Sequence, residues 1–453
     1  DNKIFFAKKE SCSLRTFCFF SESGFHAIVK SDNSTGQNRN GGFSMEAIFH
    51  KEKQQQSLYQ TQFFYGKNVQ KTVGALLKPH ATKILVLSGM ELLQRTSWYK
   101  QLRVSLQAEQ ISFIELGGIT ENTELTQIEK GIALCQDEHV DYILAVGGGS
   151  VIDSAKAIAM GAVCDHCVRM YFNAEQAPKA ALPLSVLLTI PGSGSENNGQ
   201  TMIQNDDTLL KLCCRSTVLQ PQYCFINPEI FYTVEQPQLA GAVVNIMSRL
   251  LGDYLLQLHD GADEQACAKL ELKIKSLMRK ARRLQVNRFD EQAWLELVLL
   301  DCYQPRIDKA GRQEDACLHM AAELSAMYEV SYGAVLGVLL PAWIRFVCVQ
   351  DVTRYRAFAK NVMEVADNLE PQEQLKEAVL RLEQFFLGLG LRNNLCELGI
   401  EAFCLKNVAQ ICTGYGWKQE QSFGIIKQLY WEDLYQIYQS VYDKVEERSS
   451  CSA

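Results

Sequence analysis

The stretch AVGGGSVIDSAKAIA, residues 145–159, joins an apolar run to a helical pattern. The turn between them consists of three glycines, Gly147, Gly148 and Gly149. Without side chains there, the backbone can bend sharply and approach a ligand closely. We expect Ser150 to be the helix N-cap, with Asp153 completing a capping box. The free amides and the dipole at the helix start then favour an anion such as a pyrophosphate. Lys156, one turn further, could add positive charge or be an ordinary surface lysine.

A second stretch, VVNIMSRLLGDYL at 243–255, has apolar residues at every third or fourth position, which predicts a helix. Asn245 and Arg249 are four residues apart, so on a helix they project from one face. Core packing alone does not explain an amide beside a guanidinium on a mostly apolar helix.

The charge balance argues against nucleic acid as a partner. The 453 residues include 45 Lys and Arg against 52 Asp and Glu, which gives a formal net charge of −7. A protein that follows phosphate backbones needs the opposite balance. The basic cluster at 279–283 lies in a helical pattern, and we expect it to be a solvated face.

The cysteines favour a reducing cytoplasm. All 16 are scattered through a long chain in which we find no cleavable signal pattern. Cys164 and Cys167 have metal or redox spacing, but without a second such pair a surface turn is the simpler interpretation. The longest apolar run, 332–349, is interrupted by Pro341 and Arg345, so we expect no membrane span.

The hydrophobic patterns divide the chain into three parts. Residues 1–44 contain the run SDNSTGQNRNGG, and we expect them to be a disordered extension, with the folded protein starting at Met45. Across 45–230, apolar β-branched runs alternate with helical patterns, which predicts a doubly wound, Rossmann-like α/β domain with a parallel sheet. Residues 231–453 predict an all-helical domain. We expect a ligand in the cleft between the two domains.

These patterns also predict individual elements. The expected strands are 83–89, 111–119, 140–149 and 182–192. The expected helices of the second domain are 236–258, 264–284, 290–302, 314–328, 352–366, 371–388 and 430–446.

Beside the glycine turn, further stretches support a family assignment. They are LGGITENTELTQIEKGIALCQDEHVDYIL (116–144), IPGSGSENN (190–198), LQPQYCFINPEIFYTVEQPQLAGAVVN (219–245), ELSAMYEVSYGAVLGVLLPAW (323–343) and LGLRNNLCELGI (389–400). Together they resemble the iron-containing, or group III, alcohol dehydrogenases, in particular the branch of NAD(P)H-dependent butanol dehydrogenases. The resemblance covers about 45–446 in order. It implies an NAD(P)-dependent alcohol dehydrogenase or aldehyde reductase with a small alcohol or aldehyde substrate, and a homodimer paired through the first domain.

The resemblance also implies where the dinucleotide binds. Its pyrophosphate lies on the GGGS loop, here 147–150, and a loop corresponding to 193–196 closes around the nicotinamide end. Thr189 and Ser193 would approach the cofactor, although ordinary turn chemistry would also explain these two residue types.

The choice between NAD and NADP depends on the loop after the first strand. The branch has YGGGSIKK there, whereas this chain has SGMELLQR at 88–95, which keeps only Gly89 and the basic character of Arg95. Glu91 would repel a 2′-phosphate but could accept hydrogen bonds from ribose hydroxyls, so NAD is favoured over NADP. The missing glycines weaken the case for tight docking.

In the family, one Asp and three His hold a divalent iron or zinc that polarises the alcohol oxygen. The first pair follows the pattern GVVDxxxH, which here is AVVNIMSR, so Asn245 replaces the acid and Arg249 replaces the histidine. The second pair, H-x13-H, falls on Leu318 and Tyr332, with His319 one position away.

Histidine counting leads to the same conclusion without any family pattern. After residue 226 the chain contains only His259 and His319, so three imidazoles from the helical domain are impossible. Asparagine is a weak metal ligand and tyrosine is an unusual one. Arginine cannot serve as a metal ligand because it does not lose its proton. We therefore expect the family's metal site to be absent, and His319 to be an ordinary helix histidine.

Two functions from different classes remain open. The chain could be an NAD(P)-dependent oxidoreductase, or a metal-free relative that binds a nucleotide or a partner without dehydrogenase activity. Between them lies a third hypothesis, in which Arg249 stabilises a substrate anion or a developing oxyanion. Tyr332 would then be the proton donor, although packing is the alternative for a tyrosine at a buried helix end.

Overall fold

The computed structural model describes most of the chain from residue 61 onwards. The ranges are 61–89, 96–122, 124–164, 167–172, 177–204, 211–261, 264–303, 305, 313–413 and 422–442. The predictions for residues 1–44, for a start at Met45 and for the contributions of Glu91 and Arg95 concern residues outside these ranges.

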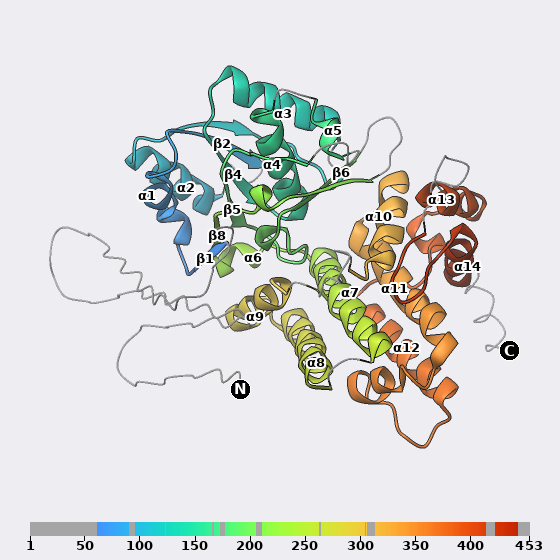
Figure 1. Cartoon of the computed structure of the whole chain (residues 1–453). Coiled ribbons are helices and arrows are strands. Elements are labelled where there is room, and N and C mark those ends of the chain that lie inside the picture. Colours follow the sequence, from blue (N-terminus) through green and yellow to red (C-terminus); the bar gives the residue numbers. More distant parts are fainter. Residues whose placement is uncertain are drawn as a thin grey trace, which may run out of the picture.

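A sheet of parallel strands forms the centre of the first domain (Figure 1). Its order is β1-β8-β5-β4-β2-β3, and each neighbouring pair is parallel. The strands are β1 (Gln62–Tyr65), β2 (Lys83–Ser88), β3 (Ser112–Leu116), β4 (Tyr142–Gly147), β5 (Leu184–Leu188) and β8 (Tyr223–Ile226). The helices of this domain are α1 (Val73–Leu77), α2 (Ser97–Ala108), α3 (Leu125–Asp137), α4 (Gly149–Ala162) and α5 (Arg169–Phe172).

Helices cover both faces of this sheet. Each strand supplies residues to both faces, because successive strand residues point to opposite sides. In β2, Ile84 and Val86 pack with Leu102 of α2, whereas Leu85 and Leu87 belong to the core that α3 and α4 share. A strand buried on both faces needs the continuous apolar run from which it was predicted. The predicted doubly wound domain followed by a helical domain is confirmed.

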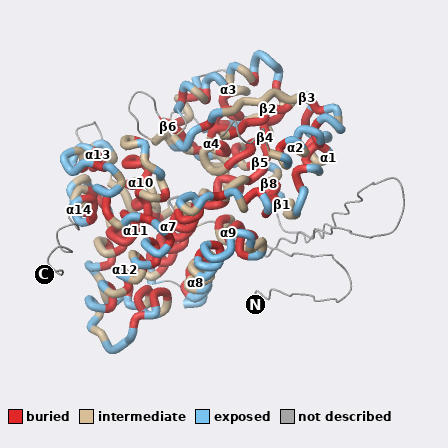
Figure 2. Tube along the Cα trace, turned by 180° about the vertical axis from the view of Figure 1, so that it is seen from behind, coloured by how far each residue is buried: buried red, intermediate tan, exposed pale blue. Residues whose placement is uncertain are grey.

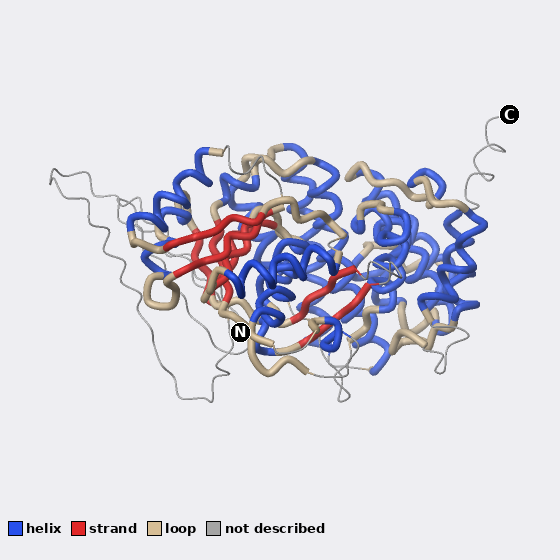
Figure 3. The backbone as a smooth tube through the Cα atoms, turned by 90° about the horizontal axis from the view of Figure 1, so that it is seen from above, coloured by secondary structure: helices blue, strands red, loops and turns tan. Residues whose placement is uncertain are grey.

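The sequence predicted β2, β3, β4 and β5 but missed four other strands. β1 and β8 have only four residues each. The antiparallel pair β6 (Gln200–Gln204) and β7 (Lys211–Arg215) consists of QTMIQ and KLCCR, which lack an apolar run. In this pair β6 contacts α4, and β7 contacts α10 of the second domain. Figure 3 shows the pair as two strands lying apart from the main sheet.

Every element that the structure describes after β8 is helical. The helices are α6 (Pro228–Phe231), α7 (Gln236–Asp260), α8 (Glu264–Val286), α9 (Glu291–Asp301), α10 (Ala316–Tyr328), α11 (Tyr332–Cys348), α12 (Pro371–Gly388), α13 (Leu405–Cys412) and α14 (Trp431–Tyr442). The predicted helix 352–366 is wrong as a continuous element, because helical structure there is confined to 356–362, most of it the π-helical segment Phe358–Val362. The sequence analysis did not predict α11 or α13 as helices.

The centre of the helical domain is α7, which packs against α8 and α11 and is buried along most of its length (Figure 2). Two helical segments, Gln236–Asp260 and Tyr332–Asp351, are long and apolar enough to cross a membrane. Their most apolar windows are 83% and 72% buried inside the protein, however, as expected for core helices. Their apolar character is thus accounted for by packing within the domain.

The contact between α7 and α11 depends on two glycines. A Cβ added to Gly333 would lie 2.3 Å from the Cα of Gly241, which neither backbone can accommodate without moving. We expect Gly333→Ala to lower the melting temperature measured by calorimetry by a few degrees, since overpacking costs about 1–3 kcal/mol. Gly388→Ala is the control, because nothing lies within 4 Å of a Cβ at that helical position. Equal melting temperatures for the two variants would contradict this packing.

Candidate functional site

The glycine turn leads directly from β4 into α4, and Gly148 is the N-cap of the helix. The prediction that Ser150 is the N-cap is wrong, because the helix already begins at Gly149. Ser150 lies in the first helical turn, where its Oγ donates a hydrogen bond to the Glu121 carbonyl at 2.8 Å. The capping box predicted with Asp153 is therefore also absent.

The glycines of this turn are needed for packing against residues 190–198, IPGSGSENN, here called the serine loop. A Cβ on Gly148 would lie 2.5 Å from Ile190 Cγ2, and one on Gly149 would lie 2.7 Å from Ser193 Cβ. The first amides of α4 still have no partner within the helix. The turn thus combines a tightly covered backbone with free donors at a helix start.

Other residues predicted to bind the cofactor lie around the same turn. The backbone N–H of Thr189 donates to the Gly147 carbonyl at 3.1 Å, directly after β5. At the end of β2, a Cβ on Gly89 would be 3.2 Å from the Ile119 carbonyl and 3.4 Å from Val151 Cγ2. The structure therefore brings Gly89, the three glycines of the turn, Ser150, Thr189 and Ser193 together.

Asp153 belongs to a different environment, underneath the serine loop. Its Oδ1 accepts a hydrogen bond from Ser195 Oγ, and its Oδ2 accepts one from the backbone N–H of Met202 at 3.2 Å. Burial raises the pKa of this carboxyl, against the lowering effect of Lys156. These contacts favour a structural role for Asp153 over direct contact with a cofactor.

Lys156 is fully buried, so it is neither a surface lysine nor a charge exposed at the turn. Its Nζ contacts four oxygens, the carbonyls of Ser195 (2.7 Å) and Gln200 (2.8 Å), Ser195 Oγ (2.9 Å) and Asn198 Oδ1 (3.0 Å). Burial lowers the pKa of Lys156 to about 8, although nearby carboxyls raise it. The ammonium group thus fastens the serine loop to α4.

Glu196 is also fully buried, and neither carboxyl oxygen has a hydrogen-bond partner among the described residues. Burial and the neighbouring Asp301 raise its pKa to about 8, against the lowering effects of Arg249 and Lys156. The carboxyl is therefore neutral at pH 7. Two cations, Lys156 and Arg249, and two other carboxyls, Asp153 and Asp301, lie near it, so a neutral Glu196 leaves these charges balanced.

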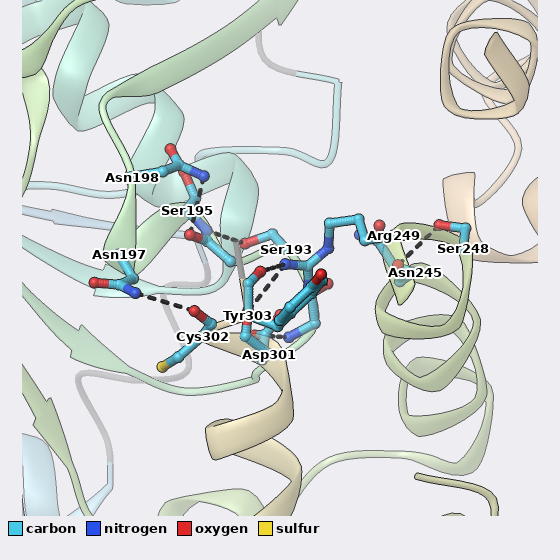
Figure 4. Close-up of polar contacts among 12 residues, drawn as sticks. Ser193, Ser195, Asn197, Asn198, Asn245, Ser248, Arg249, Asp301, Cys302 and Tyr303 are labelled. Carbon is cyan, nitrogen blue, oxygen red and sulfur yellow. Dashed lines mark hydrogen bonds and ion pairs between the residues drawn. The ribbon is translucent and has the colours of Figure 1, made fainter. Parts of the chain in front are cut away.

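Arg249 extends from α7 to the serine loop and to the end of α9 (Figure 4). Its Nη1 donates to the carbonyls of Asp301 at 2.9 Å and Tyr303 at 3.3 Å. Its Nη2 donates to the Gly192 carbonyl at 3.1 Å and to Asp301 Oδ1. The Arg249 side chain is 10% exposed and that of Asp301 is 0% exposed.

These contacts use the hydrogen-bonding capacity of the guanidinium. Its four terminal N–H groups match four acceptors, and the remaining Nε is buried without a partner among the described residues. The charge of Arg249 is compensated by Asp301 at contact distance. This geometry speaks against the hypothesis that Arg249 offers its charge to a substrate anion.

Comparison with known proteins identifies the family to which this architecture belongs. Residues 60–228 match the model of the iron-containing alcohol dehydrogenases, and 307–442 match the C-terminal model of the Fe-containing alcohol dehydrogenase family. The chain belongs to the iron-containing alcohol dehydrogenase family. The predicted family is confirmed.

Individual relatives cover most of the chain. It is similar to NADH-dependent butanol dehydrogenase A of Clostridium acetobutylicum, with 25% identity over 84% of this chain and 98% of the relative. It is 26% identical to the NADPH-dependent aldehyde reductase YqhD of Escherichia coli, over 71% of this chain and 84% of the relative. The crystal structure of NADH-dependent butanol dehydrogenase A from Thermotoga maritima superposes with a TM-score of 0.78 and 26% identity, covering 87% of this chain and 98% of that one.

The residues at the family's metal positions do not fit a divalent iron or zinc. By the resemblance, Asn245 and Arg249 stand at the first pair, and the Arg249 guanidinium, already paired with Asp301, would repel a cation. The second pair falls on Leu318, or on His319 if the helix register is shifted, and on Tyr332. Across the described ranges, no group of three His, Cys, Asp or Glu side chains is arranged to hold a metal ion.

His319 and Tyr332 have neighbours that explain them without a metal. The His319 ring stacks on Phe423, with centroids 5.3 Å apart, and its Nε2 is 3.5 Å from Asp315 Oδ2. Burial lowers the pKa of His319, but Asp315 more than offsets this and the pKa is raised. Tyr332 begins α11, its hydroxyl faces the Leu318 carbonyl at 3.5 Å, and burial raises its pKa above the usual range. A tyrosine with a raised pKa is a weaker acid, which does not help it as a proton donor.

The CxxC sequence follows the end of α4, as expected for a turn after a helix. Cys164 is half-buried, Cys167 is exposed and both are free thiols, while Asp165 and His166 lie outside the described residues. A hollow of about 260 Å³ lies beside these cysteines, and none of its lining residues belongs to the serine loop.

Sequence reasoning missed Asp301, Gly192 and Glu196. A buried arginine requires an acid, so the presence of a partner for Arg249 was foreseeable, but not which of the many Asp and Glu residues supplies it. Asp301 ends the apolar run LELVLLD, and an acid after such a run was the available signal. Only the fold brings it to within hydrogen-bonding distance of Arg249.

Glu196 generates a pH prediction. Its pKa of about 8 lies above the ordinary value of 4.5, so between these pH values the folded state holds a proton that the unfolded state has released. This group therefore makes the protein less stable as pH rises through that window. We expect the melting temperature of Glu196→Gln to rise relative to that of the parent protein as the pH increases from about 5 to 8, because the amide stays neutral.

Thermal unfolding at several pH values measures this difference, and the exposed Glu373→Gln on α12 is the control. A constant offset between Glu196→Gln and the parent protein across the range would show that Glu196 is ionised in the folded state.

Proposed function

We propose that this chain is a nicotinamide-dinucleotide-dependent oxidoreductase that interconverts small alcohols and aldehydes. The proposal rests on the turn between β4 and α4, where the glycines and the serine loop surround the free amides of a helix start. It agrees with the names of the relatives, which include NADH-dependent butanol dehydrogenases and an NADPH-dependent aldehyde reductase.

The residues around the turn fit a dinucleotide. The amides of the first turn of α4, together with the helix dipole, would hold the pyrophosphate. Thr189 and Ser193 border this turn from the other side and would orient the nicotinamide half. The dinucleotide, when bound, supplies the hydride for aldehyde reduction. Since the metal positions do not fit a metal ion, we assign no step to one.

We further propose that NAD(H) is preferred to NADP(H). In the sequence, Glu91 comes two residues after Gly89, which follows β2, and its carboxylate would repel a 2′-phosphate, whereas it could accept hydrogen bonds from the ribose hydroxyls. We also propose, from the resemblance, a homodimer paired through the first domain and, from the scattered cysteines, a cytoplasmic location.

A second candidate function is supported by the environment of Arg249. Because its terminal N–H groups are used within the protein, the position of the family's first histidine provides neither a metal ligand nor a free cation. The chain would then be a relative that binds a dinucleotide or a partner without dehydrogenase activity.

One experiment separates the two candidates. NADH and NADPH are titrated by fluorescence, and oxidation of NADH is followed with butanal, with and without added Fe²⁺ or Zn²⁺. Turnover supports the oxidoreductase, and tighter binding of NADH than NADPH supports the proposed preference. NADH binding without turnover under any metal favours the inactive relative, and absence of any dinucleotide binding refutes the first proposal.

Ser150 allows the pyrophosphate site to be tested separately from folding. An aspartate in the first turn of α4 suits the helix dipole but loses the hydrogen bond from Ser150 Oγ to the Glu121 carbonyl, so we expect Ser150→Asp to change the melting temperature little. The same carboxylate would lie near the pyrophosphate and weaken NADH binding by about tenfold or more. Ser150→Asn, which is similar in size but neutral, is the control. Unchanged NADH affinity in Ser150→Asp would place the pyrophosphate elsewhere.

A further inference from the structure

The serine loop is attached to the helical domain mainly at one place. The backbone N–H of Gly192 donates to Asp301 Oδ2, and the Gly192 carbonyl accepts from Arg249 Nη2. A third bond runs from Asn197 Nδ2 to the Cys302 carbonyl at 3.2 Å. The loop is thus bound to both α7 and the end of α9, which are separated by some 50 residues in the sequence.

The glycines of the loop match this attachment. Gly192 has a φ of +136°, and a Cβ there would lie 2.7 Å from the Cα of Ala242 on α7. Gly194 has a φ of +67°, and a Cβ there would lie 2.5 Å from Arg249 Nη1. Side chains at these two positions would push the loop away from the guanidinium.

The segment after α9 is fixed to α7 a second time. One helical turn beyond Arg249, Asp253 is 3% exposed and accepts a hydrogen bond from the Tyr303 hydroxyl. The Tyr303 carbonyl is in turn bound by Arg249. Residues 301–303 are therefore held in one position, which allows Asp301 to serve Arg249 and Gly192 at the same time.

We propose that Arg249 and Asp301 are positioning residues. Their ion pair, at a position where the family carries a metal ligand, holds the serine loop and Ser193 over the glycine turn without any divalent metal. Arg249 is thus a buried cation whose counterion, Asp301, belongs to the same chain. This inference concerns the folded arrangement and does not depend on turnover, so failure of the activity assay would leave it standing.

The first test measures hydrogen exchange of the serine loop by mass spectrometry in Arg249→Gln, Asp301→Asn and the double variant. In each single variant we expect exchange in 190–198 to accelerate about tenfold or more and the melting temperature to fall by about 5 °C or more, since each leaves a buried group without its partner. The double variant should lose less than the sum of the single losses, because no unpaired charge remains.

Arg345→Gln is the matched control. Arg345 bonds Glu383 at 2.7 Å, but this pair joins α11 to α12 within the helical domain. We expect Arg345→Gln to leave the hydrogen exchange of the serine loop unchanged. Arg249→Lys, which keeps the charge but not the fork of donors, should fall between Arg249→Gln and the parent protein, and it provides a measurement if the neutral variant does not fold. Unchanged loop exchange in Arg249→Gln, or additive losses in the double variant, would overturn the proposal.

The second test uses the unaltered full chain. Its melting temperature and loop exchange are measured after dialysis against a chelator and again after addition of Zn²⁺ or Fe²⁺. We expect no change in either quantity. A loss of stability on chelation that one equivalent of metal restores would show that a metal ion, and not the ion pair, holds this arrangement.

Discussion

A guanidinium that is 10% exposed must be neutralised and hydrogen-bonded, because an unpaired charge is costly in a low-dielectric interior. Arg249 meets this requirement with Asp301, whose side chain is fully buried and which also binds the backbone of Gly192. One carboxylate therefore connects α7, the end of α9 and the serine loop. The positions of Ser193, Ser195 and Glu196 all depend on this connection, because they follow Gly192 within four residues.

The serine loop lies between two surfaces that leave it little freedom. On one side it covers Gly148 and Gly149, and on the other it contacts Ala242 and Arg249. Lys156 fastens it from below through four oxygens. The glycine turn and the surroundings of Arg249 are consequently not independent of each other. A change at Arg249 would be transmitted to the turn through the backbone of the loop.

The family of this protein and the residues at its candidate site lead to different expectations about a metal ion. The sheet, the glycine turn and the helical domain are those of the iron-containing alcohol dehydrogenases. At the positions that the resemblance assigns to the metal ligands, the chain instead carries an amide, a paired guanidinium and a partly buried tyrosine. Fold is determined by many distributed apolar contacts, so it survives the replacement of a few polar residues. The chemistry of a metal site depends on each ligand separately.

Sequence by itself determined the parallel sheet, because β2 and β4 are continuous apolar runs, and the helical domain, because α7, α8 and α12 repeat every three to four residues. It also predicted the loss of the metal ligands, from the residue identities at 245 and 249. The strands β1 and β8 were missed because they are short and pair with strands distant in the chain, and β6 and β7 were missed because they lack an apolar run. Only the tertiary structure decided that Asp301 pairs with Arg249, that Lys156 is buried and that Ser150 is not the N-cap. Each of these follows from long-range contacts, which residue type and spacing along the chain do not specify.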